Sequence, residues 1–357
     1  MEKQMEENII ISKYNTAQKE QFFIERLVEA KNENSLICFI GAGVSISQGY
    51  PNWNQYVSQL IDYWKGHLDV LTSKEETVKD KVDMSDTLFL ESLHSMPASN
   101  KRKVDLVNYL INEYCNTGDA EKTLEIYRDH VLDFERKIFT ENDPILIKND
   151  ILNELIKLEP IFITTNYDNQ IEKSYERSTK KKAIKINSIE EIEGAVESNT
   201  VIHIHGVPDV GCNPDYFVSS ARSYADIYFL GDKQKKILEL LDGKESPVFL
   251  FVGCSMEEDE ILALLKKIRE HRVGDLKAYA LMRLEDIHSI TEANDRKKTI
   301  IESYYLNEHD VDILWFGKEF SELAQFIKIC VTKFMDKFED SISNPERLRR
   351  ELTLSEQ

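Results

Sequence analysis

The sequence has no long apolar run and no excess of positive charge. No stretch approaches the roughly 20 apolar residues that a membrane-spanning helix needs, and the acidic N-terminus does not resemble a signal peptide. We therefore expect a cytoplasmic protein without membrane contacts. A formal net charge of -19 argues against unspecific DNA binding, because a polyanion repels an acidic surface. We also expect no direct sequence-specific contact with nucleic acid.

Cysteine is scarce, and its spacing does not fit the usual zinc motifs. No two of the five cysteines are close enough in sequence to suggest a zinc-binding pair. We therefore expect reduced thiols in the core and no zinc or other metal site. The five are Cys38, Cys115, Cys212, Cys254 and Cys330.

A hydrophobic content of 41% is enough for a sizeable core, and residues 36–45 are its clearest feature. They predict a buried strand that runs into a glycine turn at Gly41 and Gly43. Because glycine lacks a Cβ, a phosphate can approach such a turn closely, and free amides at the start of the following short helix would favour a pyrophosphate. A tight turn without any ligand is the alternative.

Further short apolar runs predict strands at 160–165, 183–186, 201–205, 248–252, 278–282 and 313–316, with 183–186 at an edge. Helical spacing predicts helices at 17–31, 257–270 and 319–338. Short apolar strands separated by helices indicate an α/β fold, in which a Rossmann-like parallel sheet carries helices on both faces.

Residues 67–158 show no convincing strand, and three amphipathic stripes predict an inserted helical module there. The expected domains are therefore a discontinuous Rossmann-like domain at 1–66 and 159–340, the module at 67–158, and a polar tail at 341–357.

Four of the predicted strands end in polar or glycine residues. In an open parallel sheet, ligands bind outside the carboxyl ends of the strands, where the strand order switches. We therefore expect these four ends to form one nucleotide-binding site. They are Gly41-Ala42-Gly43-Val44-Ser45, Thr165-Asn166-Tyr167-Asp168, His205-Gly206 and Gly253-Cys254-Ser255.

This ordered set of motifs resembles the sirtuin family of NAD-consuming enzymes. The glycine turn, a Gly-Tyr-Pro segment followed by Trp53, the Asn166 motif, His205-Gly206 and Gly253-Cys254-Ser255 each have a sirtuin counterpart. The resemblance implies that NAD+ is bound by Gly41, Ala42, Gly43, Ser45, Pro51, Trp53, Thr165, Gly253 and Ser255.

The sequence also departs from the sirtuin pattern. The two Cys-x-x-Cys pairs and the Phe-Gly-Glu of the acyl-lysine channel are absent, Asn54 replaces an arginine, and the asparagine that meets the adenosine ribose has no clear match near Met282-Arg283. The chain thus looks like the bacterial sirtuin-like branch that hydrolyses NAD+ to nicotinamide and ADP-ribose in anti-phage defence. An NAD-dependent protein deacylase and a non-catalytic module that binds NAD or ADP-ribose are the alternatives.

We assign Asn166, His205 and Asp168 as the catalytic residues. Asn166 would orient water or the ribose hydroxyls, Asp168 would bind the nicotinamide amide or fix Asn166, and His205 would act as general base with a pKa near the usual 6.5. His203 should point to the same side as His205 and be its structural neighbour.

Structural alternatives remain for several of these residues. Asn166 and Asp168 could cap the helix that begins near Gln170, and Ser45 and Ser255 could be helix caps. His205 could be a buried histidine bonded to the backbone.

The resemblance also implies that activity is controlled, because an unrestrained NADase would kill its host. We see no fused sensor domain in the sequence, so we expect a homo-oligomer or a separate defence partner. A HerA-type ATPase is the first candidate, followed by an Argonaute-like protein or a phage protein.

Overall fold

The computed structural model describes residues 14–72, 83–141, 149–194, 196–209, 213–229, 235–236, 240, 244, 246–256, 259–271, 276–284 and 291–343. These residues form a seven-stranded sheet in the order β3-β4-β2-β1-β5-β6-β7, and every adjacent pair is parallel. The predicted Rossmann-like α/β fold is confirmed.

The strands lie where the apolar runs predict them, with ends shifted by a residue or two. The central strands β1, β2, β4 and β5 are buried along their whole length, as a parallel sheet covered on both faces requires. The predicted edge strand β3 is at an edge. The bounds are β1 (Leu36–Ile40), β2 (Ile161–Thr164), β3 (Ile184–Ile186), β4 (Thr200–His203), β5 (Val248–Val252), β6 (Lys277–Arg283) and β7 (Val311–Gly317).

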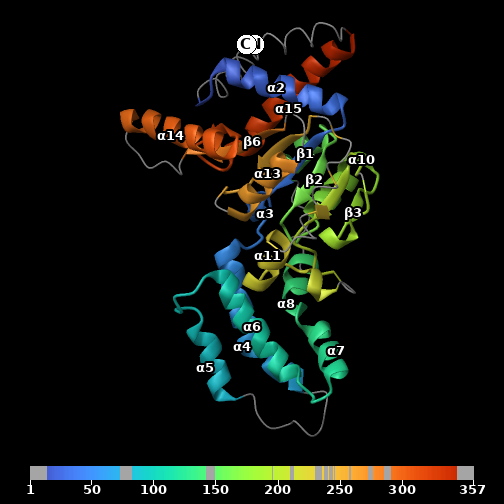
Figure 1. The fold of residues 1–357 in the computed structure, drawn as a ribbon, viewed down its shortest axis with the longest axis vertical. Coiled ribbons are helices and arrows are strands. Elements are labelled where there is room, and N and C mark those ends of the chain that lie inside the picture. The colour runs from blue at the N-terminus through green and yellow to red at the C-terminus, as the bar shows by residue number, and fades with distance from the viewer. Residues whose placement is uncertain are drawn as a thin grey trace.

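Helices cover both faces of the sheet (Figure 1). Side chains of one group of helices share a hydrophobic cluster with Cys38 and Ile40 of β1. Those of the other group pack with Ile37 and Phe39, on the opposite face. The first group is α2 (Ala17–Asn32), α9 (Asp150–Ile156), α10 (Gln170–Thr179) and α15 (Glu322–Ser343). The second is α11 (Ala221–Tyr228), α13 (Asp259–His271) and α14 (Thr291–His309).

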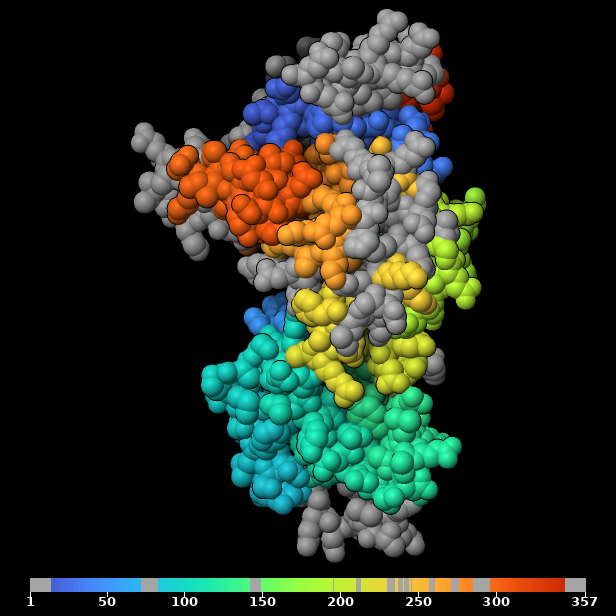
Figure 2. Space-filling model, in the orientation of Figure 1, coloured from blue at the N-terminus to red at the C-terminus, as the bar shows by residue number. Residues whose placement is uncertain are grey.

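Between β1 and β2, a set of helices forms the lower end of the molecule in Figures 1 and 2. They have a hydrophobic cluster of their own, separate from the two that flank the sheet. We call this set the helical module. It comprises α4 (Trp53–Thr72), α5 (Met84–Ser92), α6 (Asn100–Cys115), α7 (Ala120–His130), α8 (Asp133–Arg136) and the π-helical turn η1 (Lys137–Glu141).

The division into domains stays a prediction, and the structure suggests different limits for it. The expected boundary at residue 66 falls inside α4, and the side chains of α9 pack with the sheet. We therefore propose that the module runs from α4 to η1. Cys212 and residues 344–357 of the expected tail lie outside the described residues.

The sheet order brings the four polar strand ends together. β4, β2, β1 and β5 are four consecutive strands of the sheet. The chain leaves β1 toward β2 and returns on its other side with β5, so the order switches at β1. This is where a parallel sheet is expected to bind its ligand.

Candidate active site

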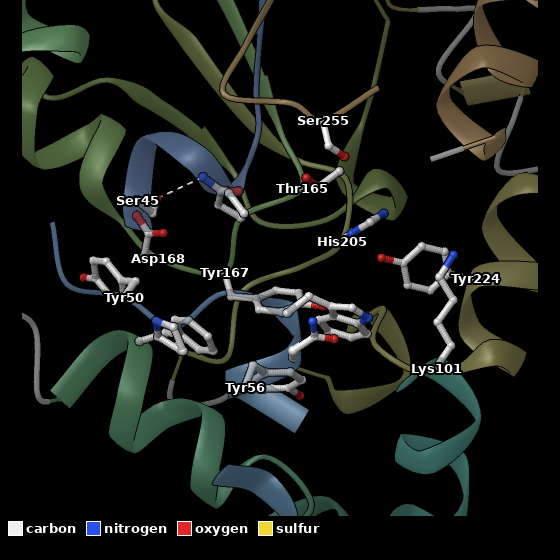
Figure 3. Close-up of a pocket in the computed structure, with 16 residues that line it drawn as sticks. Ser45, Tyr50, Tyr56, Lys101, Thr165, Tyr167, Asp168, His205, Tyr224 and Ser255 are labelled. Carbon is white, nitrogen blue, oxygen red and sulfur yellow. Dashed lines mark hydrogen bonds between the residues drawn. The ribbon is translucent and has the colours of Figure 1, made fainter. Parts of the chain in front are cut away.

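Two adjoining cavities lie at this switch point. The first has a volume of about 450 Å³ and opens between the sheet and the helical module (Figure 3). Its lining residues are Ala42, Ser45, Tyr50, Pro51, Trp53, Asn54, Tyr56, Lys101, Phe139, Thr165, Asn166, Tyr167, Asp168, His205, Tyr224 and Ser255.

The second cavity, of about 540 Å³, lies beside the carboxyl ends of β5, β6 and β7. It shares Ala42, Trp53, Thr165 and Ser255 with the first cavity, so the two meet at the glycine turn. Its remaining described residues are Gly41, Gly43, Ile46, Gly253, Cys254, Met256, Ile261, Leu262, Leu281, Met282, Arg283, Phe316 and Phe320.

Every predicted site residue therefore lines one of these cavities, although their roles stay predictions. The three predicted catalytic residues, Asn166, Asp168 and His205, all line the first cavity. Ser45 and Pro51 lie with them. The glycines of the two loops line only the second cavity. The structure thus divides the predicted residues between two adjoining cavities.

The glycine turn is built for close packing of two loops. The Gly43 amide donates to the Gly253 carbonyl at 2.9 Å, and a Cβ on Gly43 would lie 2.8 Å from that oxygen. The Gly41 amide donates to the carbonyl of Val252 at 2.9 Å. The amides of these two glycines therefore pair with the neighbouring strand end. The following helix, α3 (Ala42–Ile46), is a little more than one turn long.

Asn166 ties the end of β2 to the glycine turn. Its side-chain Nδ2 donates to the carbonyl of Gly41 at 3.0 Å and to Ser45 Oγ at 2.9 Å. The dashed line at Ser45 in Figure 3 marks the second of these bonds. It does not cap α10, so that interpretation is wrong for Asn166. Ser45 lies inside α3 and is not its N-cap, which is Gly41.

Asp168 does contribute to capping. Its Oδ1 accepts a hydrogen bond from the backbone N–H of Gln170 at 3.0 Å, at the start of α10. The carboxyl group is also buried in the cavity wall, where burial raises its pKa and a hydrogen bond with Ser45 opposes that shift. Asp168 is thus both a helix-terminus residue and a wall of the first cavity.

His203 and Glu172 form a buried pair behind Asn166. His203 Nε2 lies 2.7 Å from Glu172 Oε1, and His203 Nδ1 lies 3.0 Å from the carbonyl oxygen of Asn166. Burial alone would lower the pKa of His203, but the charge and hydrogen bond of Glu172 outweigh it and raise that pKa. In its protonated form His203 would donate from both nitrogens, to Glu172 and to the Asn166 carbonyl.

His205 has a different environment. It is 1% exposed, its Nε2 lies 2.8 Å from the hydroxyl of Tyr228, and its ring packs edge-to-face on Tyr224. Since β4 ends at His203, the two histidines bond to helices on opposite faces of the sheet, and the prediction that they share a side is wrong. The His205 partner is a side chain, which also departs from the interpretation of a histidine bonded to the backbone.

The prediction of an ordinary pKa for His205 is also wrong. Burial lowers this pKa to about 3, with a further contribution from the positive charge of Lys101. The Lys101 ammonium lies 3.6 Å from the ring centroid of Tyr224, as Figure 3 shows beside the histidine. His205 is therefore a neutral imidazole at physiological pH, able to accept one hydrogen bond and donate another.

Apart from Trp53, sequence reasoning missed the wall of the first cavity that the helical module supplies. Tyr56 of α4, Lys101 of α6 and Phe139 of η1 reach the first cavity from this module. None of the three belongs to a recognisable site motif in the sequence, so only the folded arrangement reveals them. Tyr224 of α11 was missed for the same reason.

Glu135 is a buried acid that contacts Tyr56, one of the residues lining the first cavity. Glu135 is 3% exposed, and its Oε1 accepts a hydrogen bond from the Tyr56 hydroxyl at 2.6 Å. Its Oε2 has no hydrogen-bond partner among the described residues. Burial raises the pKa of Glu135 to about 7, although the Tyr56 bond lowers it.

This shift predicts a pH-dependent stability. Between pH 4.5 and pH 7 the unfolded chain loses the Glu135 proton while the folded chain keeps it, so stability falls as pH rises, by up to about 1.4 kcal/mol per pH unit. Glu135→Gln should remove this slope, because an amide does not titrate. Urea unfolding of both proteins at pH 5, 6, 7 and 8 measures how the free energy of unfolding changes with pH. Glu125→Gln, an exposed position on α7, is the matched control, and parallel curves for wild type and Glu135→Gln would contradict the assignment.

Among the described residues, no group of three or more histidine, cysteine, aspartate or glutamate side chains could hold a metal ion. Within the same part of the chain, no helix is both long and apolar enough to cross a bilayer.

Comparison with known proteins agrees with the resemblance. Residues 160–313 match the family model of the SIR2-like domain. The NAD(+) hydrolase ThsA of Bacillus cereus (strain MSX-D12) is 26% identical over 270 residues, which are 74% of this chain and 47% of that protein. The chain thus spans about half the length of this relative. The family match begins just before β2 and ends within β7, so it includes three of the four polar strand ends.

Proposed function

We infer that this chain, which carries a SIR2-like domain, hydrolyses NAD+ at the bond between nicotinamide and ribose. The observation that carries this proposal is the pair of cavities that meet at the glycine turn. A dinucleotide consists of two nucleosides joined by a pyrophosphate, and each cavity could take one of them. The similarity to a relative named as an NAD(+) hydrolase supports the same reaction.

The chemistry of the walls suggests which half goes where. The first cavity contains Asp168 and His205, so it suits the reacting nicotinamide riboside. The second is mostly apolar, and its Phe316 and Phe320 rings lie edge-to-face with centroids 6.0 Å apart, which suits a purine. The pyrophosphate would then lie along the shared residues, which include Thr165 and Ser255.

Cleavage would pass through an oxocarbenium-like state at C1′ of the ribose. The electron pair of the breaking C1′–N bond returns to the pyridinium ring, so nicotinamide leaves as a neutral molecule and needs no proton. Water then bonds to C1′ and loses a proton. The products are nicotinamide, ADP-ribose and one proton.

Three residues would assist this step. Because Asn166 Nδ2 is bonded to the glycine turn, its Oδ1 is the atom left to orient water or a ribose hydroxyl. His205 is neutral and would accept a hydrogen bond from the same groups. Asp168 would face the nicotinamide amide. The lowered pKa makes His205 a weak base, so we assign it an orienting role and leave the final proton to solvent.

The test is NAD+ turnover with and without an acyl-lysine peptide. We expect the purified protein, with its partner where activity requires one, to release nicotinamide and ADP-ribose in equal amounts without the peptide. Chromatography of the products over time measures this. Release that depends on the peptide would instead indicate a deacylase, and tight binding of NAD+ without turnover would indicate an assembly module.

We also propose that the reaction depletes NAD+ in the cytoplasm as part of an anti-phage response. Such an activity must be restrained in an uninfected cell, so we propose control through a homo-oligomer or a defence partner. A HerA-type ATPase remains the first candidate. Size-exclusion chromatography with the neighbouring gene product tests the partner, and separate elution under all conditions would argue against it.

A further inference from the structure

We propose that the adenosine end of the site accepts a 2′-phosphate, so that NADP+ is a substrate as well as NAD+. This inference rests on the proposed hydrolysis of a nicotinamide dinucleotide. The feature that carries it is the charge of the second cavity. Arg283 is the only charged residue among the described residues that line this cavity.

Arg283 lines the cavity that we assign to the adenosine half of the dinucleotide. It is the last residue of β6, at the carboxyl end of the strand, and lines the same cavity as the Phe316–Phe320 pair. The pairing of β6 with β7 shifts register between Met282 and Arg283. Such an irregularity at a strand end re-aims the side chain that follows it.

An arginine at this position indicates a ligand with a phosphate on its ribose. Sites that bind the free ribose of NAD usually place a carboxylate on the 2′-hydroxyl, whereas an arginine accommodates the 2′-phosphate of NADP. No carboxylate lines the described part of this cavity. The guanidinium fork matches a phosphate in two parallel hydrogen bonds, and the apolar surroundings strengthen such a charged pair.

The net negative charge of the whole chain gives the positive charge of Arg283 a larger effect on the choice of ligand. With a net charge of -19, the protein repels a dinucleotide that carries an extra phosphate, and this repulsion falls off over about 10 Å in ordinary salt. A cation inside the cavity acts at contact distance and is screened much less. Arg283 would therefore decide the preference.

The experiment compares kcat/KM for the two dinucleotides in the full-length protein. We expect NADP+ to be cleaved at least as efficiently as NAD+. Arg283→Gln should lower the ratio of kcat/KM for NADP+ to that for NAD+ by at least about tenfold, and Arg283→Lys should lower it less, because the charge remains without the fork. Arg128→Gln is the matched control, since Arg128 of α7 forms an exposed ion pair with Asp215.

Binding separates failure of this inference from failure of the proposed function. Adenosine 2′,5′-bisphosphate should bind the wild type at least about tenfold more tightly than 5′-AMP, and Arg283→Gln should abolish the difference. If NAD+ is cleaved and NADP+ is not, or if Arg283→Gln leaves the ratio unchanged, the inference is overturned while hydrolysis stands. If neither dinucleotide is cleaved, hydrolysis is overturned, and equal binding of the two adenosine phosphates would overturn the inference as well.

Discussion

Replacing His205 with alanine is expected to lower kcat for nicotinamide release by at least about 10²-fold, the size of effect that follows when groups around a reacting centre are no longer correctly oriented. The imidazole is buried in the wall of the first cavity, and its Nε2 is bonded to Tyr228. A neutral ring fixed in this way can orient water or a ribose hydroxyl without moving. Because the interaction would form fully only as C1′ becomes cationic, KM should change little. Steady-state kinetics on NAD+ measures both constants.

Two controls separate catalysis from folding in this experiment. His94→Ala removes a partly exposed histidine of the helical module, which bonds to Asp62, and should leave kcat unchanged. Thermal unfolding should show that His205→Ala keeps its fold. Since the pKa of His205 is about 3, its imidazole stays neutral from pH 8 down to pH 5. A loss of wild-type activity with a midpoint near pH 6.5 that disappears in His205→Ala would contradict this assignment, as would full activity in the variant.

The strands of this fold could be predicted because a buried parallel strand leaves a simple signal. Residues 248–252 are apolar throughout, and β5 spans Val248–Val252. The polar strand ends could also be placed, since parallel strands bring their carboxyl ends to one edge. The helix α14 was missed. It exposes apolar residues such as Ile300 and Tyr304. Its sequence therefore lacks the spacing of apolar residues, three or four positions apart, that marks a helix packed on one face.

The electrostatics of the site could not be predicted, because they depend on residues distant in the sequence. The pKa of His205 is set by burial and by Lys101, which lies on an inserted helix about a hundred positions earlier. Sequence spacing placed His203 on the same side as His205, but the strand ends between them. As a result, neighbouring histidines carry opposite pKa shifts, one raised by Glu172 and one lowered by burial. Only the packing of α10 and α11 distinguishes them.

Replacing Asn166 is the second change with a large expected effect. Asn166→Ala should lower kcat by at least about 10²-fold, because a small misplacement of groups around a reacting centre has an effect of that size. Removing the amide also leaves the Gly41 carbonyl and the Ser45 hydroxyl without this donor, at a cost of about 1–3 kcal/mol in stability. Nicotinamide release and urea unfolding measure the two effects separately. Asn116→Ala, in an exposed turn where Asn116 bonds to the backbone of Gly118, is the matched control.

Asn166→Asp and Ser45→Ala distinguish an active amide from a purely structural one. Asp keeps the size and an acceptor oxygen but cannot donate to the Gly41 carbonyl, and it adds a charge in the same buried wall as Asp168. Ser45→Ala removes one of the two acceptors that Nδ2 contacts and also the hydrogen bond between Ser45 and Asp168. If Asn166 orients the reacting groups, Asp should be nearly as slow as Ala, because its oxygen is no longer anchored through a donor to the Gly41 carbonyl. Ser45→Ala should lose less than about thirtyfold, two hydrogen bonds being worth about 2 kcal/mol. Equal losses in all three variants, in step with their stability, would mean that Asn166 only holds the two strand ends together. In that case the orienting role would pass to His205 alone.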